Sequence, residues 1–81
     1  MKYYKWTYVR SNYGVSVYTM IGKKFKSRFF NDLYMTLFIK NDNGDYVSLK
    51  NFRRGLPILH HKADVENFEE IDKKEIFLLM L

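Results

Sequence analysis

The chain has 81 residues, a formal net charge of +5 and 47% hydrophobic residues, and 19% of its residues are aromatic. This length admits one small domain and the hydrophobic content is enough to build a core, so a two-domain protein and an intrinsically disordered chain are both excluded. The absence of cysteine excludes a disulfide scaffold and a cysteine-based metal site, and the longest apolar run, Ile76–Leu81, is far shorter than a bilayer span.

Aromatic residues dominate the first predicted strand. Aromatic and β-branched residues fill Tyr3–Val9, a composition typical of a strand. Because side chains alternate along a strand, Tyr4, Trp6 and Tyr8 are expected to share one face. A turn signal at 11–14 follows, so we expect the chain to reverse there.

Three further strands are predicted from alternating side chains. The segment 15–20 is expected to pair with the first strand as a hairpin. A reversal at 21–23 is expected to lead into a third strand over 24–30, and a break at 31–32 into a fourth over 33–40. The side chains expected to share one face of the fourth strand are Leu33, Met35, Leu37 and Ile39.

The strongest turn signal lies between two alternating segments. An Asn43-Gly44 pair separates the fourth strand from residues 46–52, and glycine readily adopts the positive φ that a tight hairpin turn requires. Residues 46–52 are therefore predicted to pair with the fourth strand. The segment 56–62 contains Pro57, which cannot donate a backbone hydrogen bond, so we expect an irregular or edge segment there.

The C-terminal segment carries helix signals. Asp64 is a candidate N-cap, acidic residues follow it and lysines come late, an order that suits the helix dipole. The helix is predicted to begin within two residues of Asp64, with Val65, Phe68 and Ile71 on its inward stripe. The tail Ile76–Leu81 continues the helix or forms a last buried strand, and its pattern does not separate the two. We expect the tail to be buried against the sheet or in the seam of a homodimer.

These elements together predict the fold class and its organisation. The class is α+β, with a small antiparallel sheet of about five strands and one C-terminal helix in a single domain over 1–81. A basic, strand-rich body would span 1–62, and the acidic helix with its apolar tail would span 63–81.

Charge is distributed unevenly along the chain. Residues 1–31 carry seven cations and no acid, and residues 1–62 carry twelve cations and three acids, a net charge of +9. Residues 63–81 carry six acids and two lysines, a net charge of −4. A basic surface of this kind attracts polyanions, so nucleic acid is the first class of partner to consider.

A row of cations, Lys24, Lys26 and Arg28, carries the most specific binding signal. On a strand, alternate residues lie about 6.6 Å apart on one face, a spacing able to follow the phosphates of an extended nucleic-acid strand. The alternative is a solvated sheet face or a guarded edge strand, where lysine prevents aggregation. A second basic patch, which is either a phosphate site or a simple exposed turn, consists of Lys50, Arg53 and Arg54.

Aromatic side chains of the first strand offer a stacking surface. Tyr4, Trp6 and Tyr8 would stack on bases, and Arg10 would lie on the same face to contact phosphate. The alternative is that these side chains form the core. The chain has too many aromatic residues to bury them all, so we expect some of them in the core and others on the surface.

Signals for catalysis, metals and cofactors are weak. Neighbours on an extended segment point to opposite faces, so His60 and His61 are poorly placed to chelate one metal ion. The acids fall in a turn or on a charged helix and the glycines are isolated, so neither a paired-carboxylate site nor a phosphate-binding glycine loop is present. We therefore expect no cofactor, no metal and no enzymatic activity, and keep a small basic ribonuclease as a third alternative.

The sequence favours a non-enzymatic binding protein. We expect it to engage RNA or single-stranded DNA through a cation-rich and aromatic-rich sheet surface, in the cytoplasm and away from membranes. The alternative is a viral accessory protein, from a bacteriophage, that binds and inhibits a host protein or ribonucleoprotein in the host cytoplasm. Abundant Lys, Tyr, Phe and Asn with a single Ala, as AT-rich codons produce, favour this alternative.

Overall fold

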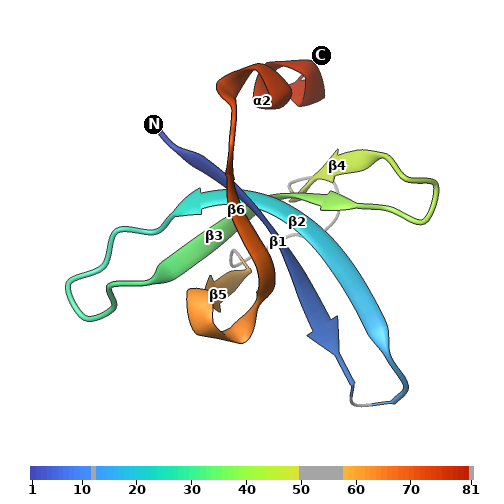
Figure 1. The fold of residues 1–81 in the computed structure, drawn as a ribbon, viewed down its shortest axis with the longest axis horizontal. Helices are drawn as coiled ribbons and strands as arrows, with labels where there is room; N and C mark the ends of the chain where they lie inside the picture. Colours follow the sequence, from blue (N-terminus) through green and yellow to red (C-terminus); the bar gives the residue numbers. More distant parts are fainter. Residues whose placement is uncertain (12, 50–57, 81) are drawn as a thin grey trace.

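The computed structural model describes residues 1–11, 13–49 and 58–80. The strands of this part are β1 (Tyr3–Arg10), β2 (Ser16–Lys24), β3 (Leu33–Lys40), β4 (Tyr46–Ser48), β5 (Leu59–His61) and β6 (Glu66–Ile71), and the helices are η1 (Lys62–Asp64) and α2 (Lys73–Met80). The strands form one antiparallel sheet in the order β4-β3-β2-β1-β6, with β5 also paired to β3 (Figure 1). This arrangement confirms the predicted α+β class. Within the described ranges, no helix is long and apolar enough to cross a membrane.

β1 and β2 form the first predicted hairpin, in a register that places Trp6 opposite Met20. The hairpin extends past the rest of the sheet, because β6 pairs with β1 only up to Thr7 and β3 pairs with β2 only from Met20 onward. Figure 1 shows this projecting end on the opposite side of the sheet from the connection between β2 and β3. We call its described residues, 8–11 and 13–19, the β1–β2 arm.

The sheet carries one hydrophobic cluster on each face, because side chains alternate along its strands. The buried residues of the first, called the Trp6 cluster, are Trp6, Met20, Tyr34 and Ile39. The buried residues of the second, called the Ile21 cluster, are Ile21, Ile71 and Ile76. Residues that precede β5 and β6 pack against the Trp6 cluster, whereas α2 packs against the Ile21 cluster.

A one-residue bulge interrupts the pairing of β2 with β3. Phe38 and Thr36 pair with consecutive residues of β2, so Leu37 is the extra residue. Beyond the bulge the alternation of β3 is inverted, and Ile39 lies in the Trp6 cluster together with Tyr34. The prediction that the four odd-numbered apolar residues of this strand share one face is therefore wrong for Ile39, since alternation holds only while the ladder is regular.

Gly22 lies within β2 and not in the predicted reversal at 21–23. A Cβ atom at this position would overlap the carbonyl oxygen of Met35 and meet the indole ring of Trp6. The glycine therefore permits a close approach of two strands beside the bulge. The predicted turn is wrong because glycine marks close packing here, a requirement that the neighbouring sequence does not reveal.

The predicted turn at Asn43-Gly44 is confirmed. Gly44 has a φ of +87°. The side-chain Oδ1 of Asn41 accepts the backbone N–H groups of Asn43 and Asp45, at 3.1 and 2.9 Å. These hydrogen bonds close the turn locally, as Asn side chains commonly do. β4, which follows, is shorter than predicted, and part of the predicted segment lies outside the described residues.

β5 forms an edge segment, as predicted for the region around Pro57, although Pro57 itself lies outside the described residues. Tyr34 of β3 lies opposite His60, and the backbone N–H of Thr36 donates to the Ile58 carbonyl at 3.0 Å. β4 pairs with the C-terminal end of β3 and β5 with its N-terminal end. Both short strands therefore lie along the side of β3 that faces away from β2.

β6 occupies the position where a helix was predicted. Phe68 stacks on Tyr4 with ring centroids 5.0 Å apart, whereas Ile71 is buried in the Ile21 cluster. Residues three apart share one side of a helix but point to opposite faces of a strand. Phe68 and Ile71 therefore pack in different clusters, one on each face of the sheet. The prediction of a helix from Asp64, with Val65, Phe68 and Ile71 on one stripe, is therefore wrong.

The C-terminal helix, α2, contains residues 76–80 of the apolar tail. Asp72 caps it, because its side-chain Oδ1 accepts the backbone N–H of Lys74 at 3.0 Å. Ile76 is buried in the Ile21 cluster, whereas Phe77 and Leu78 are exposed. The helical alternative is confirmed for the described part of the tail, and only one side of it is covered by the sheet.

Candidate nucleic-acid interface

The predicted cation row lies mainly on the connection between β2 and β3. β2 ends at Lys24, and the backbone N–H of Phe25 donates to the Leu33 carbonyl at 2.8 Å before the chain leaves the ladder. The hydroxyl oxygen of Ser27 then accepts the backbone N–H of Phe29 at 3.1 Å. Such local side-chain hydrogen bonds compete with strand pairing. The predicted third strand is therefore wrong.

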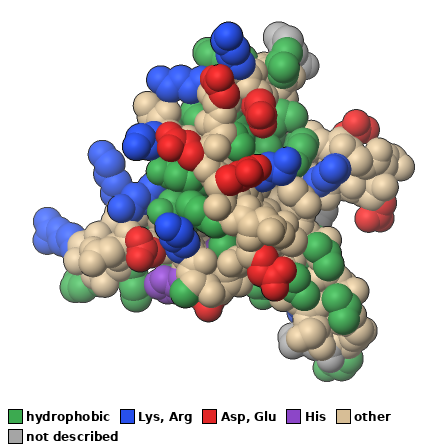
Figure 2. Space-filling view, viewed as in Figure 1, with side chains coloured by type: hydrophobic (Ala, Val, Ile, Leu, Met, Phe, Trp, Pro, Cys, Tyr) green, Lys and Arg blue, Asp and Glu red, His purple; other side chains and the backbone are tan. Residues whose placement is uncertain are grey.

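The exposure of this connection still alternates. Lys24, Lys26 and Arg28 are exposed, while Phe25 and Ser27 between them are half-buried. Figure 1 shows the connection projecting from the sheet, and Figure 2 shows Lys and Arg side chains along the same margin of the molecule. The three cations are therefore available to one anionic partner, although no strand places them in a row.

Two exposed phenylalanines follow the cations. The side chain of Phe29 is 87% exposed and that of Phe30 is 50% exposed. The ring of Phe30 lies edge-on to His61, with centroids 5.4 Å apart. Neither phenylalanine is among the predicted site residues, although their position directly after the last cation of an acid-free segment is a signal that could have identified them. We call residues 24–30 the basic loop.

The aromatic surface predicted on β1 is largely core. Trp6 is 1% exposed and its ring lies 6.0 Å from Phe68 and 6.3 Å from Tyr34. Tyr4 is half-buried and also stacks on Phe68. The indole of Trp6 has no free face for a base, so the stacking surface cannot include Trp6. The core alternative applies to it.

The outer part of the same surface stays open. Tyr8, Arg10 and Tyr18 line a cavity of about 290 Å³, which His60 also lines. Aromatic side chains beside an arginine suit a base and its phosphate. This cavity is the part of the predicted stacking surface that a ligand can reach.

His60 contacts both the core and this cavity. Its ring lies 4.5 Å from Tyr8 and 6.3 Å from Trp6, and its Nε2 is buried with no hydrogen-bond partner among the described residues. Burial lowers the pKa of His60 from its ordinary value of 6.5, and the charge of Asp64 acts in the opposite direction. His61 is exposed, so the two imidazoles lie in different environments. In the described ranges, no three His, Cys, Asp or Glu side chains gather closely enough to hold a metal ion.

The structure places two groups of predicted site residues at opposite ends of β2, whereas Tyr4 and Trp6 lie between them. The basic loop follows the C-terminal end of this strand, and Arg10 lies opposite Ser16 at its N-terminal end. Eight residue steps separate the two ends, about 26 Å at 3.3 Å per residue. A single compact contact therefore cannot include both groups. The second predicted patch lies outside the described residues and consists of Lys50, Arg53 and Arg54.

Comparison with known proteins identifies no relative of this chain. No protein-family model, curated protein or solved structure matches it. A function can therefore be inferred from the chemistry of the basic loop and of the cavity on the β1–β2 arm.

Proposed function

We propose that the protein binds single-stranded RNA or single-stranded DNA through the basic loop. One observation carries this proposal: three exposed cations at alternate positions lead directly into two exposed phenylalanines on a projecting connection. Cations that track phosphates and aromatic rings that stack on bases are the two components of most single-strand binding surfaces.

The two kinds of side chain make different contributions. Lys24, Lys26 and Arg28 would neutralise phosphates and release counterions, which makes the affinity dependent on salt. Phe29 and Phe30 would stack on bases, with about 1 to 3 kcal/mol for each stacked base. Stacking requires unpaired bases, so a single strand suits this loop better than a duplex. Neither contact reads base edges, so we expect little sequence preference.

The cavity on the β1–β2 arm supplies a second contact for the same ligand. Tyr8 lies opposite Tyr18 and Arg10 opposite Ser16, about 20 Å and 26 Å along β2 from Lys24, so only a strand long enough to follow β2 would reach both the cavity and the basic loop. Tyr4 lies between the two groups in the register of β1, opposite Gly22, and is half-buried. We therefore expect affinity to rise with oligonucleotide length until the ligand spans β2.

The salt dependence of binding tests the role of the basic loop. Replacement of Lys24, Lys26 and Arg28 by Gln should lower the slope of log affinity against log salt by roughly two units, because each phosphate contact contributes about 0.7 for a single strand. The matched control replaces three exposed lysines elsewhere, Lys40, Lys73 and Lys74, by Gln and changes the net charge equally. Equal slopes for the two variants would contradict the proposal, since net charge alone would then explain binding.

The stacking contribution requires a separate variant. Phe29→Ala with Phe30→Ala should weaken binding of oligouridine without changing the salt slope, because no charge is lost. Phe77→Ala, which removes an exposed aromatic side chain from α2, is the control and should bind normally. Unaltered affinity of the double variant would remove base stacking from the proposal.

Two further functions remain as outcomes of these measurements. The same cations and phenylalanines would suit an acidic host-protein surface, as the accessory-protein alternative requires. Failure to bind any oligonucleotide, together with capture of a host protein that survives nuclease treatment, would favour that function. Cleavage of a labelled RNA that the wild-type chain performs and a His61→Gln variant does not would favour a ribonuclease.

A further inference from the structure

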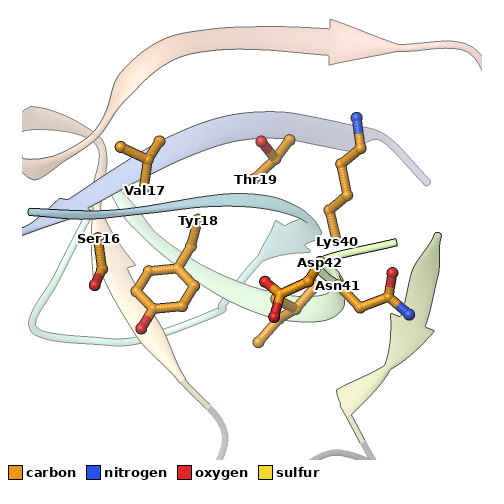
Figure 3. A pocket seen from close by; sticks show the side chains of 8 residues that line it. Ser16, Val17, Tyr18, Thr19, Lys40, Asn41 and Asp42 are labelled. Carbon is orange, nitrogen blue, oxygen red and sulfur yellow. The ribbon is translucent and has the colours of Figure 1, made fainter. Parts of the chain in front are cut away.

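The groove beside the N-terminal end of β2 offers a nucleic-acid strand no further attraction. It has a volume of about 520 Å³ and lies between residues 16–19 and residues 39–42 (Figure 3). Its charged side chains, those of Lys40 and Asp42, have opposite signs, so the groove exerts no net attraction on a polyanion. The basic loop has a different neighbour, β5, whose exposed His61 contacts Phe30. This contact adds a titratable group to the surface that we propose for binding.

Two backbone contacts hold His61 beside the C-terminal end of the basic loop. His61 pairs with Leu33, the first residue of β3, and the backbone N–H of Lys62 donates to the carbonyl oxygen of Asp32 at 3.0 Å. The imidazole and the ring of Phe30 have centroids 5.4 Å apart and an angle of 68° between their planes. Both side chains remain accessible, since Phe30 is 50% exposed and His61 is exposed. His61 therefore has a fixed position and a free surface.

The residues next to His61 in the chain are engaged on the other face of the sheet. Neighbouring side chains of a strand point to opposite faces, and the ring of His60 lies 4.5 Å from that of Tyr8. The Nζ atom of Lys62 lies over the ring of Phe68, 5.3 Å from its centroid, on the same side as His60. His61 is therefore the residue of this segment that is placed to extend the basic loop.

We propose that the binding surface of the basic loop extends onto β5, where the protonated imidazole of His61 contacts a phosphate of the strand whose base stacks on Phe30. This inference rests on the proposed function. Each base is joined through its sugar to a phosphate, so a base on Phe30 brings a phosphate close to that ring. The imidazole lies 5.4 Å from the same ring, within reach of a single nucleotide. An imidazolium donates hydrogen bonds from both ring nitrogens, and hydrogen bonds between charged groups are stronger than neutral ones.

The charge of the imidazole decides whether this contact forms. Charged residues of both signs flank it in the chain and on the same face of the sheet. They are Lys23, Arg28, Asp32, Lys62 and Asp64. Aspartate, lysine and arginine side chains ordinarily keep their charge between pH 5.5 and 7, whereas histidine changes its charge in this range. Acidification should therefore strengthen binding by adding one cation beside Phe30.

The pH dependence of binding tests the role of His61. The wild-type chain should bind oligouridine with hydroxyl ends up to about fivefold more tightly at pH 5.5 than at pH 7, the range of one exposed ion pair. Hydroxyl ends are required because a terminal phosphate itself gains charge near pH 6. The slope of log affinity against log salt should also be steeper by about 0.7 at pH 5.5.

The chain has two histidines, so each supplies the control for the other. His61→Gln should remove both differences, and His60→Gln, on the opposite face, should retain them. His61→Lys carries a permanent cation and should bind at pH 7 about as tightly as the wild type does at pH 5.5, which separates charge from packing against Phe30. Circular dichroism at both pH values checks that each variant is folded.

The outcomes distinguish this inference from the proposed function. A wild-type chain that binds through the basic loop with equal affinity at both pH values would overturn the role of His61 and leave the proposed function intact. A pH dependence that persists in His61→Gln would also overturn this role, since another group would then be responsible. Absence of binding to oligouridine and oligothymidine at both pH values would overturn the proposed function and this inference together.

Discussion

The two halves of β2 have the same neighbour on one side and different surroundings on the other. The inner half, Met20–Lys24, pairs with β3 throughout and with β1 as far as Gly22, and Ile21 is 2% exposed. Among the described strands, the outer half, Ser16–Thr19, pairs only with β1, and Val17 is 61% exposed. The comparison teaches that stability and recognition are separated along one strand. The inner half holds the two cores together, and the surfaces that we propose for binding lie at the two ends.

The largest effect is expected from Trp6→Ala, which removes the largest side chain packed against the inner half. Loss of a buried tryptophan costs about 3 to 5 kcal/mol of unfolding free energy. Small domains have about 5 to 15 kcal/mol in total, so this variant should be unfolded or barely folded at 37 °C. Circular dichroism during urea titration measures the change. A variant that melts within a few degrees of the wild type would break the distinction between the two halves.

A smaller loss of unfolding free energy is expected from Gly22→Ala. The new Cβ would overlap a backbone carbonyl oxygen, which cannot rotate away as a flexible side chain would. Overpacking of this kind costs about 1 to 3 kcal/mol. The same urea titration measures it, with Ser16→Ala in the exposed outer half as the control for a change of comparable size. An equal effect of the two substitutions would show that close packing is not confined to the inner half.

The pH dependence of stability tests the packing of β5 beside the inner half. Because burial lowers the pKa of His60 below 6.5 in the folded state, the unfolded chain binds more protons in this range. The free energy of unfolding should therefore be highest above pH 6.5 and fall on acidification until the lowered pKa is passed. Thermal unfolding between pH 7.5 and 5 measures this loss. His60→Gln should reduce it, whereas the exposed neighbour variant His61→Gln should retain it.

The smallest change in stability is expected from Val17→Ala. Exposed substitutions usually change the unfolding free energy by less than about 0.5 kcal/mol. Amide hydrogen exchange would sharpen the comparison, since Met20–Lys24 should be protected and Ser16–Thr19 should exchange more rapidly. Strong protection of both halves at low concentration would contradict the separation of roles.

Local signals predicted the parts of the fold that depend on neighbouring residues alone. The first hairpin and the turn at Asn43-Gly44 are formed by alternation and by glycine geometry, and both are confirmed. The errors occur where a distant contact decides the conformation. Gly22 marks a close approach to Met35, and Phe68 is drawn into a strand by aromatic rings that lie more than thirty residues away.

The candidate site was predictable in its charges but not in its aromatic residues. Cations almost always remain in water, so the exposure of Lys24, Lys26 and Arg28 follows from their chemistry. Aromatic residues occur both in the core and on the surface of proteins. Which of them are covered here depends on how distant segments pack. Trp6 is buried, with Phe68 of β6 and His60 of β5 beside it, whereas Phe29 remains exposed.

The bulge at Leu37 gives β3 a constraint on its length as well as on its composition. Deletion of Leu37 would remove the bulge and leave Thr36 and Phe38 opposite consecutive residues of β2 in a regular ladder. Deletion of another β3 residue would turn the side chains between the deletion and the bulge to the opposite face of the sheet. A substitution disturbs one cluster, whereas a deletion of the second kind exchanges residues between two. Over evolutionary time, changes in the length of β3 should therefore be confined to the bulge, while other insertions and deletions accumulate in the connections.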